Sequence, residues 1–199
     1  MRSAREIQGE FLDEVDQLLR EGEAVFAGLV LPQWGGDLHG YPRTLYGLLM
    51  NSFALADRLS FYFAPRSERG KQTERLRAFY RSVGSTPDAA AAAVQIWRHT
   101  LMHTGLPAAV TDTETGISYR WLLHWGEPHL PREQHMTVVA SSATDRVLNV
   151  GAIYLAEDLR REAMRLFGTL HDSQQLRDGL CAADAELAQI QDRPFGLAP

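Results

Sequence analysis

The residues with the clearest chemical potential are an arginine and two histidines at the end of a predicted helix. Arg98, His99 and His103 occur in the stretch QIWRHTLMHTGLP, where Gly105 and Pro107 end an otherwise apolar helical pattern. A histidine, with an unperturbed pKa of about 6.5, can accept and return a proton at neutral pH. An arginine can bind two phosphate oxygens at once. The segment therefore carries side chains suited to proton transfer beside a bound phosphate.

The spacing within this segment limits how the side chains can meet. Five residues along a helix turn the direction by roughly 140° and rise about 7.5 Å, so Arg98 and His103 do not share one face. The long arginine side chain can still swing its head group toward the helix end. His99 and His103 are four residues apart and lie on one face.

A structural role for the same residues is the alternative. A histidine in the last turn of a helix interacts favourably with the helix dipole, by about 0.3–1 kcal/mol. An arginine there can donate hydrogen bonds to the terminal carbonyls. The sequence alone leaves both roles open.

The segment from Arg98 to His103 resembles the signature of the HEPN superfamily. That signature is an Arg, then Asn, Asp or His, then three residues, then His, and here it reads Arg-His-Thr-Leu-Met-His. In the superfamily the motif lies near the end of an inner helix of an all-α bundle, and many members are metal-independent ribonucleases that act as homodimers. The resemblance implies that motifs from two protomers meet in one composite site at the dimer interface.

The function that this resemblance implies is cleavage of single-stranded RNA by attack of the 2′-hydroxyl, without metal or other cofactor. His103 would be the acid and base, Arg98 would hold the phosphate, and His99 would orient Arg98 or contact the substrate. The expected products are a 2′,3′-cyclic phosphate and a 5′-hydroxyl. Gly105 stands where nucleotidyltransferase-linked toxins of the superfamily have Tyr, so we do not expect their modification chemistry. The alternative is a non-catalytic HEPN-like helical dimer that binds a ligand or a protein as a regulatory module.

A zinc site on the same two histidines is a further alternative. The spacing His99-x3-His103 is one by which a helix presents two imidazoles to zinc. Thr100 stands where a helical metalloprotease motif has its Glu, and nothing in the sequence fixes a third ligand. The candidates for that third ligand are His124, His129 and His135. Because none of them is fixed by the sequence, we expect no metal.

The charge balance argues against a broad nucleic-acid-binding surface. The 199 residues carry a formal net charge of −5, whereas such surfaces are normally basic. Of the 20 basic residues only Lys71 is a lysine. Because guanidinium groups bind phosphate in a two-pronged manner, local phosphate recognition stays open, although coding bias also explains the arginines.

The compartment and the partners follow from composition and from the resemblance. Cys181 is the only cysteine, so no intramolecular disulfide can form, and a reducing compartment fits best. No apolar run approaches 18 residues, and the N-terminus lacks a signal-peptide core. We expect a cytoplasmic protein with no membrane contact. The expected partners are a second copy of the chain, an RNA substrate, and a protein or nucleotide regulator that the sequence does not identify.

Hydrophobic periodicity predicts a mostly α fold, a HEPN-like helical bundle, in a single domain covering residues 1–199. A small antiparallel β insertion is expected between about residues 107 and 150, with one pair of strands around the turn TETG and a second pair around SSATD. A loop rich in Gly and Pro is expected at 28–42 and a charged, mobile connection at 65–72. The expected helices are 4–26, 44–63, 73–83, one from Thr86 to about Gly105, one starting near Ala152, and 173–191.

Overall fold

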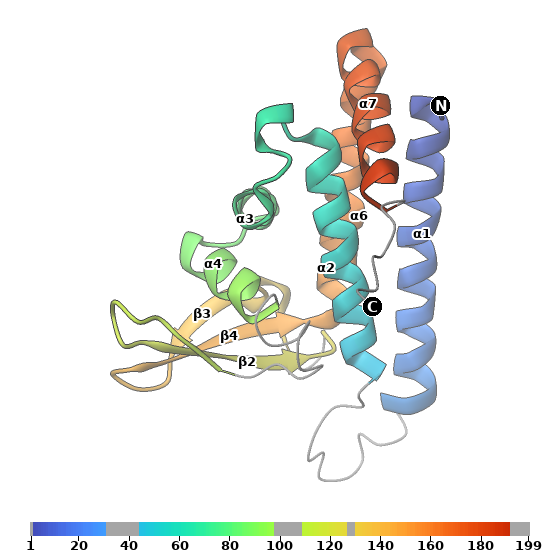
Figure 1. The fold of residues 1–199 in the computed structure, drawn as a ribbon. Coiled ribbons are helices and arrows are strands. Elements are labelled where there is room, and N and C mark those ends of the chain that lie inside the picture. Colours follow the sequence, from blue (N-terminus) through green and yellow to red (C-terminus); the bar gives the residue numbers. More distant parts are fainter. Residues whose placement is uncertain (1, 31–43, 98–108, 127–129, 192–199) are drawn as a thin grey trace, which may run out of the picture.

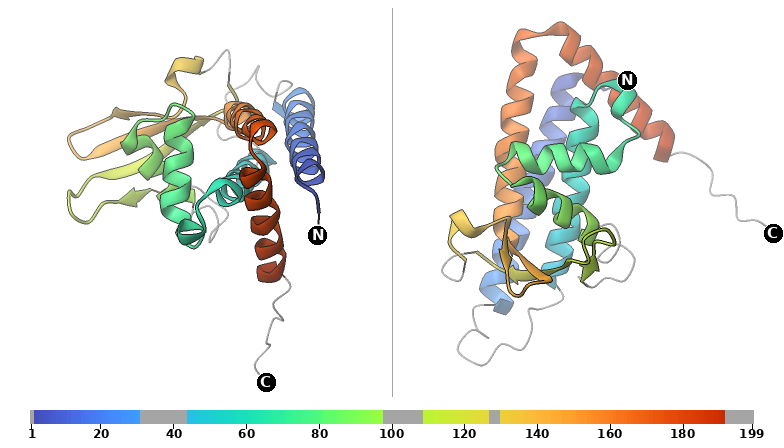
Figure 2. Two further views of the ribbon diagram at one scale, coloured as in Figure 1. Left: turned by 90° about the horizontal axis from the view of Figure 1, so that it is seen from above. Right: turned by 90° about the vertical axis from the view of Figure 1, so that its left-hand side faces the viewer.

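The structure, a computed structural model, describes residues 2–30, 44–97, 109–126 and 130–191. Long helices lie side by side in a bundle, and the sheet projects from the side of the bundle opposite to α1 (Figures 1 and 2). Among the described helices, none is long and apolar enough to cross a membrane. The bundle helices are α1 (Ala4–Val25), α2 (Thr44–Phe63), α6 (Ala152–Gly168) and α7 (Gln174–Gln191), and the shorter helices are α3 (Gln72–Ser82) and α4 (Pro87–Ile96).

Local sequence signals explain where the first helix begins. Ser3 and Glu6 form a capping box, in which the Ser3 hydroxyl accepts the Glu6 N–H and the Glu6 carboxylate accepts the Ser3 N–H. The expected helix at 4–26 is confirmed over Ala4–Val25. The chain then continues as a π-helix at Phe26–Val30. The prediction of a loop at 28–42 is therefore wrong for residues 28–30. The rest of that expected loop lies outside the described residues, up to residue 42.

The sheet has four strands in the order β1-β2-β4-β3. The two expected antiparallel pairs are confirmed, since Val110 pairs with Tyr119 and Thr137 pairs with Asn149. The expectation of a wholly antiparallel insertion is wrong, because the central pair, β2 and β4, is parallel along its whole length. The sheet is therefore mixed. Its strands are β1 (Val110–Thr111), β2 (Ser118–His124), β3 (Thr137–Ala140) and β4 (Asp145–Gly151).

Burial explains why the second hairpin joins the sheet through its second strand. β4 carries Leu148 and Val150, which are 0% and 1% exposed, whereas Val139 of β3 is 47% exposed. The central position gives the more deeply buried strand a backbone partner on each side. The more exposed β3 lies at the edge. Side-chain periodicity is the same for either order, so the sequence pattern did not reveal the parallel pair.

An aromatic cluster around Phe53 joins the bundle to the smaller elements. Phe53 of α2 is fully buried and stacks on Trp97, with ring centroids 5.4 Å apart. Tyr80 of α3 meets the same ring edge-on at 5.4 Å, and Trp121 of β2 lies at 5.8 Å. One phenyl ring therefore holds α2, α3, the end of α4 and the sheet in a fixed arrangement.

The expected charged connection at 65–72 is anchored rather than free. Arg66–Glu68 form a 3-10 helix, η3. Arg69 is buried, with its guanidinium 2.7 Å from the Glu186 carboxylate and donating to the Gly179 carbonyl of α7. The connection is thus tied to the last helix of the bundle.

A buried ion pair attaches α3 to α2. The Arg75 guanidinium donates to the Asp57 carboxylate at 2.7 Å, and its side chain is only 7% exposed. Gln72 donates to the other oxygen of Asp57 at 2.6 Å. The guanidinium also lies over the ring of Phe61, 5.2 Å from its centre. Removing Asp57 would leave a buried cation without its carboxylate.

We predict that Asp57→Ala lowers the free energy of unfolding by about 3 kcal/mol, the cost of leaving a buried charge unpaired. The matched control is Asp16→Ala, which breaks the exposed pair between Asp16 and Arg160 and should cost less than about 1 kcal/mol. Urea unfolding followed by circular dichroism measures both. Equal, small losses in the two variants would show that Arg75 does not depend on Asp57.

Candidate functional site

The chain reaches the predicted motif from a fixed point in the core. Arg98, His99 and His103 themselves lie outside the described residues, so their role stays a prediction. The last described residue before them, Trp97, is 4% exposed and stacks on Phe53. The segment therefore begins directly after a side chain that the core holds in place.

Helix α4 forms where the sequence predicts a helix start. The Thr86 hydroxyl accepts the Ala89 N–H at 3.2 Å, and Pro87 occupies the first helical position. Small side chains on the buried face let the helix lie close to α3 and over the sheet (Figure 1). Most of that face is alanine: Ala89, Ala90, Ala92, Ala93, Val94 and Ile96 are buried.

A cleft of about 640 Å³ runs along α4, between this helix and the β1–β2 hairpin. Its helical wall has the spacing of one helix face and ends at Gln95, three residues before Arg98 in the sequence. Arg77 of α3 lies at the cleft as well. The cleft thus extends along the last described turn of α4, which precedes the motif in the sequence. Its polar lining includes Arg77, Asp88, Gln95, Thr111, Asp112 and Tyr119.

The polar groups of the cleft are suited to binding. Arg77 forms no ion pair with any described residue, so its charge is available to an anion. The hydrogen bonds that Asp112 accepts from the Glu114 N–H and the Thr115 hydroxyl lower the pKa of Asp112. This carboxylate is committed to its own turn and does not act as a base near neutral pH. The described walls of the cleft supply a guanidinium, an amide and a phenol. The groups that transfer protons must therefore come from residues outside these walls.

A second polar cluster, which the sequence did not predict, surrounds the buried carboxylate of Asp158 on α6. Asp158 is 4% exposed and pairs with both Arg132 and Arg161, while the Nε2 atom of His135 lies 3.4 Å away. Only the i, i+3 pair between Asp158 and Arg161 has a sequence signal. Arg132 and His135 belong to the distant β2–β3 connection, so spacing could not reveal the contact.

The environment of His135 fixes its protonation. The Nδ1 atom accepts the Gly151 N–H at 3.0 Å, and burial lowers the pKa of His135 although Asp158 opposes the shift. The ring is therefore neutral, with its proton on Nε2 facing Asp158. The Nδ1 atom is occupied by the Gly151 N–H, and the Nε2 atom is buried and faces Asp158 at 3.4 Å, so the described surroundings of His135 do not present it as the third zinc ligand that the sequence left open.

Tyr154 completes this junction between the sheet and the bundle. Its ring lies against Gly151, where an added Cβ would come within 2.5 Å of the ring. Its hydroxyl donates to the Leu130 carbonyl at 3.1 Å, and the Arg132 guanidinium lies 4.6 Å from the ring centre. These contacts hold the β2–β3 connection on α6. The cluster around Asp158 is thus a support that sets the sheet, and with it the cleft wall, against the bundle.

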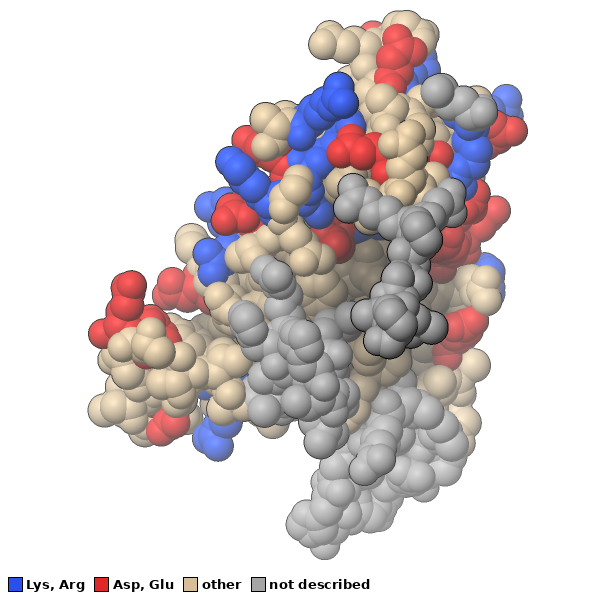
Figure 3. All heavy atoms as spheres, viewed as in Figure 1, with Lys and Arg blue, Asp and Glu red and all other residues tan. Residues whose placement is uncertain are grey.

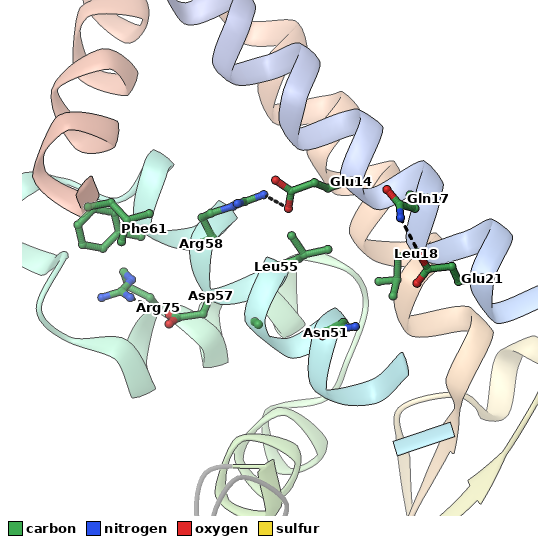
Figure 4. Close-up of a pocket in the computed structure, with 12 residues that line it drawn as sticks. Glu14, Gln17, Leu18, Glu21, Asn51, Leu55, Asp57, Arg58, Phe61 and Arg75 are labelled. Atoms are coloured by element: carbon green, nitrogen blue, oxygen red, sulfur yellow. Dashed lines mark hydrogen bonds and ion pairs between the residues drawn. The ribbon is translucent and has the colours of Figure 1, made fainter. Parts of the chain in front are cut away.

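A groove of about 480 Å³ between α1 and α2 holds a third group of charges (Figure 4). Arg58 extends from α2 toward Glu14 of α1 and donates to its carboxylate. Gln17 donates to Glu21 at 2.8 Å along α1. Arg75 and Asp57 pair at the far end. The charged groups of this groove therefore mainly hold helices together, and the groove is a weaker candidate for chemistry than the cleft beside α4.

Comparison with known proteins finds no match. Neither protein-family models, nor curated proteins, nor solved structures match this chain. The resemblance of residues 98–103 to the HEPN signature therefore remains a sequence-based prediction.

We predict that His135 makes the stability depend on pH below its usual pKa of 6.5. Because burial lowers the pKa in the folded state, the unfolded chain takes up the proton first, and acid favours unfolding. The contribution of His135 is fully present above pH 6.5 and is lost as the pH falls through 6.5 toward the folded-state pKa. The uptake of this one proton limits the slope to at most about 1.4 kcal/mol per pH unit.

The matched variant is His135→Asn, in which the Asn amide oxygen can accept the Gly151 N–H but does not titrate. Urea unfolding over a pH series on both sides of 6.5 should show a shallower acid slope for the variant than for wild type. Superimposable slopes would mean that His135 is equally protonated in both states.

Proposed function

We propose that the protein is a metal-independent endoribonuclease that cleaves single-stranded RNA, with a composite site formed by two copies of the chain. In this proposal His103 takes and returns the proton, Arg98 binds the reacting phosphate, and His99 orients Arg98 or contacts the RNA. The described residues supply the surface on which the RNA is positioned.

The observation that carries the proposal is the cleft beside α4. Its volume of about 640 Å³ lies in the range of small-molecule sites. On the helix side the cleft is lined by the small side chains of Ala91 and Ala92. Tyr119 and Gln95 offer an aromatic ring and an amide to a nucleobase. Arg77, whose guanidinium forms no ion pair with a described residue, offers it to a phosphate. These groups support the binding of a nucleotide next to the turn that precedes the motif.

The chemistry requires two proton transfers and stabilisation of one developing charge. His103 as the base removes the proton from the 2′-hydroxyl, whose oxygen then forms a bond to phosphorus. The bond from phosphorus to the 5′-oxygen breaks, and an imidazolium, from His103 of the same or the partner copy, protonates that oxygen. Arg98 donates to the phosphate oxygens while their negative charge increases.

We predict that His103→Ala and Arg98→Ala each lower RNA cleavage at least about 100-fold, the usual contribution of a general acid–base group for His103 and of a donor that stabilises developing charge for Arg98. Cleavage by wild type should persist in EDTA and leave 2′,3′-cyclic phosphate ends. The control is His171→Ala, an exposed histidine on the 3-10 helix Thr169–Asp172, which should cleave as wild type does. Gel assays with end-group analysis measure activity, and thermal melting shows whether each variant is folded.

Two results would contradict this assignment. If wild type leaves varied single-stranded RNAs intact, with or without nucleotides, the protein is better described as a binding or regulatory module. If both motif variants lose activity together with their melting transition, the motif is structural. Light scattering tests the composite site, because a fully active monomer would exclude it.

We also predict that Ala91→Trp impairs RNA binding by filling the cleft. The indole would occupy space beside Gln95 and Tyr119 and should raise the KM for RNA about tenfold, or about 1.4 kcal/mol of lost binding. Its matched control is Ala24→Trp on an exposed position of α1. Steady-state kinetics with a fluorogenic RNA gives KM. An unchanged KM in folded Ala91→Trp would exclude the cleft as the RNA site.

A further inference from the structure

The helix α3 and the turn before it carry a concentration of positive charge. Residues 66–82 contain six basic and two acidic residues, a net charge of +4 in a chain whose total is −5. The only lysine of the chain, Lys71, is among them. The positive charge is thus local, and the rest of the chain repels polyanions.

The structure separates these six basic residues into two groups. Arg69 and Arg75 are buried and paired with carboxylates, so they serve the fold. The other four form no ion pair with any described residue. We name these four, Arg66, Lys71, Arg77 and Arg81, the α3 basic surface.

The accessibility of these side chains makes them available to a ligand. Arg66, Lys71 and Arg81 are exposed, and Arg77 is half-buried. Basic side chains gather on the surface over η3 and α3 in Figure 3, interspersed with a few carboxylates. The tip of the sheet, by contrast, carries mainly acidic charge in this view. One region of the visible face therefore attracts anions.

The α3 basic surface is continuous with the cleft beside α4. Arg77 and Arg81 are four residues apart and share one face of α3. Arg77 also lines the cleft that ends at Gln95. An extended anionic chain lying on α3 could therefore pass over Arg77 into the cleft.

We infer that the α3 basic surface binds the phosphate backbone of single-stranded RNA and guides the strand into the cleft beside α4. The inference rests on the proposed function for its choice of RNA as the polyanion. Guanidinium groups bind phosphates with paired hydrogen bonds, and the aromatic and amide groups of the cleft suit the bases that accompany those phosphates. An acidic polypeptide would use the positive charge but would have no base to place beside Tyr119.

The test measures RNA affinity separately from cleavage. The probe is a fluorescein-labelled, unstructured single-stranded RNA, and all binding variants carry His103→Ala so that the RNA stays intact. The test variant adds Arg66→Gln, Lys71→Gln and Arg81→Gln. The control variant instead adds Arg5→Gln, Arg20→Gln and Arg160→Gln, which remove the same number of charges from α1 and α6.

We predict that the test variant binds RNA about tenfold more weakly at low salt, whereas the control variant binds nearly as the parent does. Each lost phosphate contact reduces the slope of log K against log salt by about 0.7, so the three changes should reduce it by about 2. In the cleavage-competent background, the same three substitutions should raise KM and leave kcat unchanged. Fluorescence anisotropy over a salt series and steady-state kinetics measure these effects.

The outcomes distinguish this inference from the proposed function. Unchanged affinity and salt slope in the test variant would overturn the α3 basic surface even if wild type cleaves RNA. Salt-dependent binding that the test variant loses would support the surface even if no cleavage is found. Equal affinity for polyglutamate and RNA would overturn the assignment to RNA.

Discussion

The packing around Phe53 is the constraint on which the rest of the structure depends. This ring stacks on Trp97 and contacts Tyr80 and Trp121, so it holds α2, the end of α4, α3 and β2 together. Each of these elements except α2 contributes to, or directly supports, a wall of the cleft. A shift of the ring would move the three walls apart and would displace the point from which the 98–103 segment begins.

The buried carboxylate of Asp158 is a second attachment of the sheet to the bundle, at a place that the packing around Phe53 does not contact. Phe53 holds the sheet through β2, whereas Asp158 holds the β2–β3 connection on α6 through Arg132 and His135. A buried carboxylate costs free energy unless several donors satisfy it, and here two guanidinium groups and an imidazole surround it. The sheet is thus fixed to the bundle by an apolar contact on one side and by a charged one on the other. This double attachment gives the cleft a defined shape without a ligand.

Most of the helices could be predicted from the sequence because their signals are local. The helix at 44–63 has the predicted bounds, and the start of α4 follows from Thr86 and Pro87. The two hairpins could also be predicted, because their signals are equally local in the sequence. The parallel pairing of β2 with β4 was not predictable, because it depends on which edge of the second hairpin packs against the first.

The candidate site, like the fold, could be predicted from the sequence only in part. Motif spacing identified Arg98, His99 and His103 as candidates, and these lie outside the described residues. The cleft was not predicted, because it joins Arg77 and Tyr119, which are 42 positions apart in the sequence and meet only in the fold. The cluster around Asp158 was not predicted either, because its residues on the β2–β3 connection are also distant from Asp158 in the sequence and meet it only in the fold.

The most direct measurement of the central claim asks whether the 2′-hydroxyl of the substrate is the nucleophile. Wild type would be given a single-stranded RNA and the same sequence with every 2′-hydroxyl methylated, in EDTA, with binding and cleavage followed in parallel. The account predicts that the protein binds both strands and cleaves only the unmodified one. Cleavage of the methylated strand, or cleavage of neither, would contradict it.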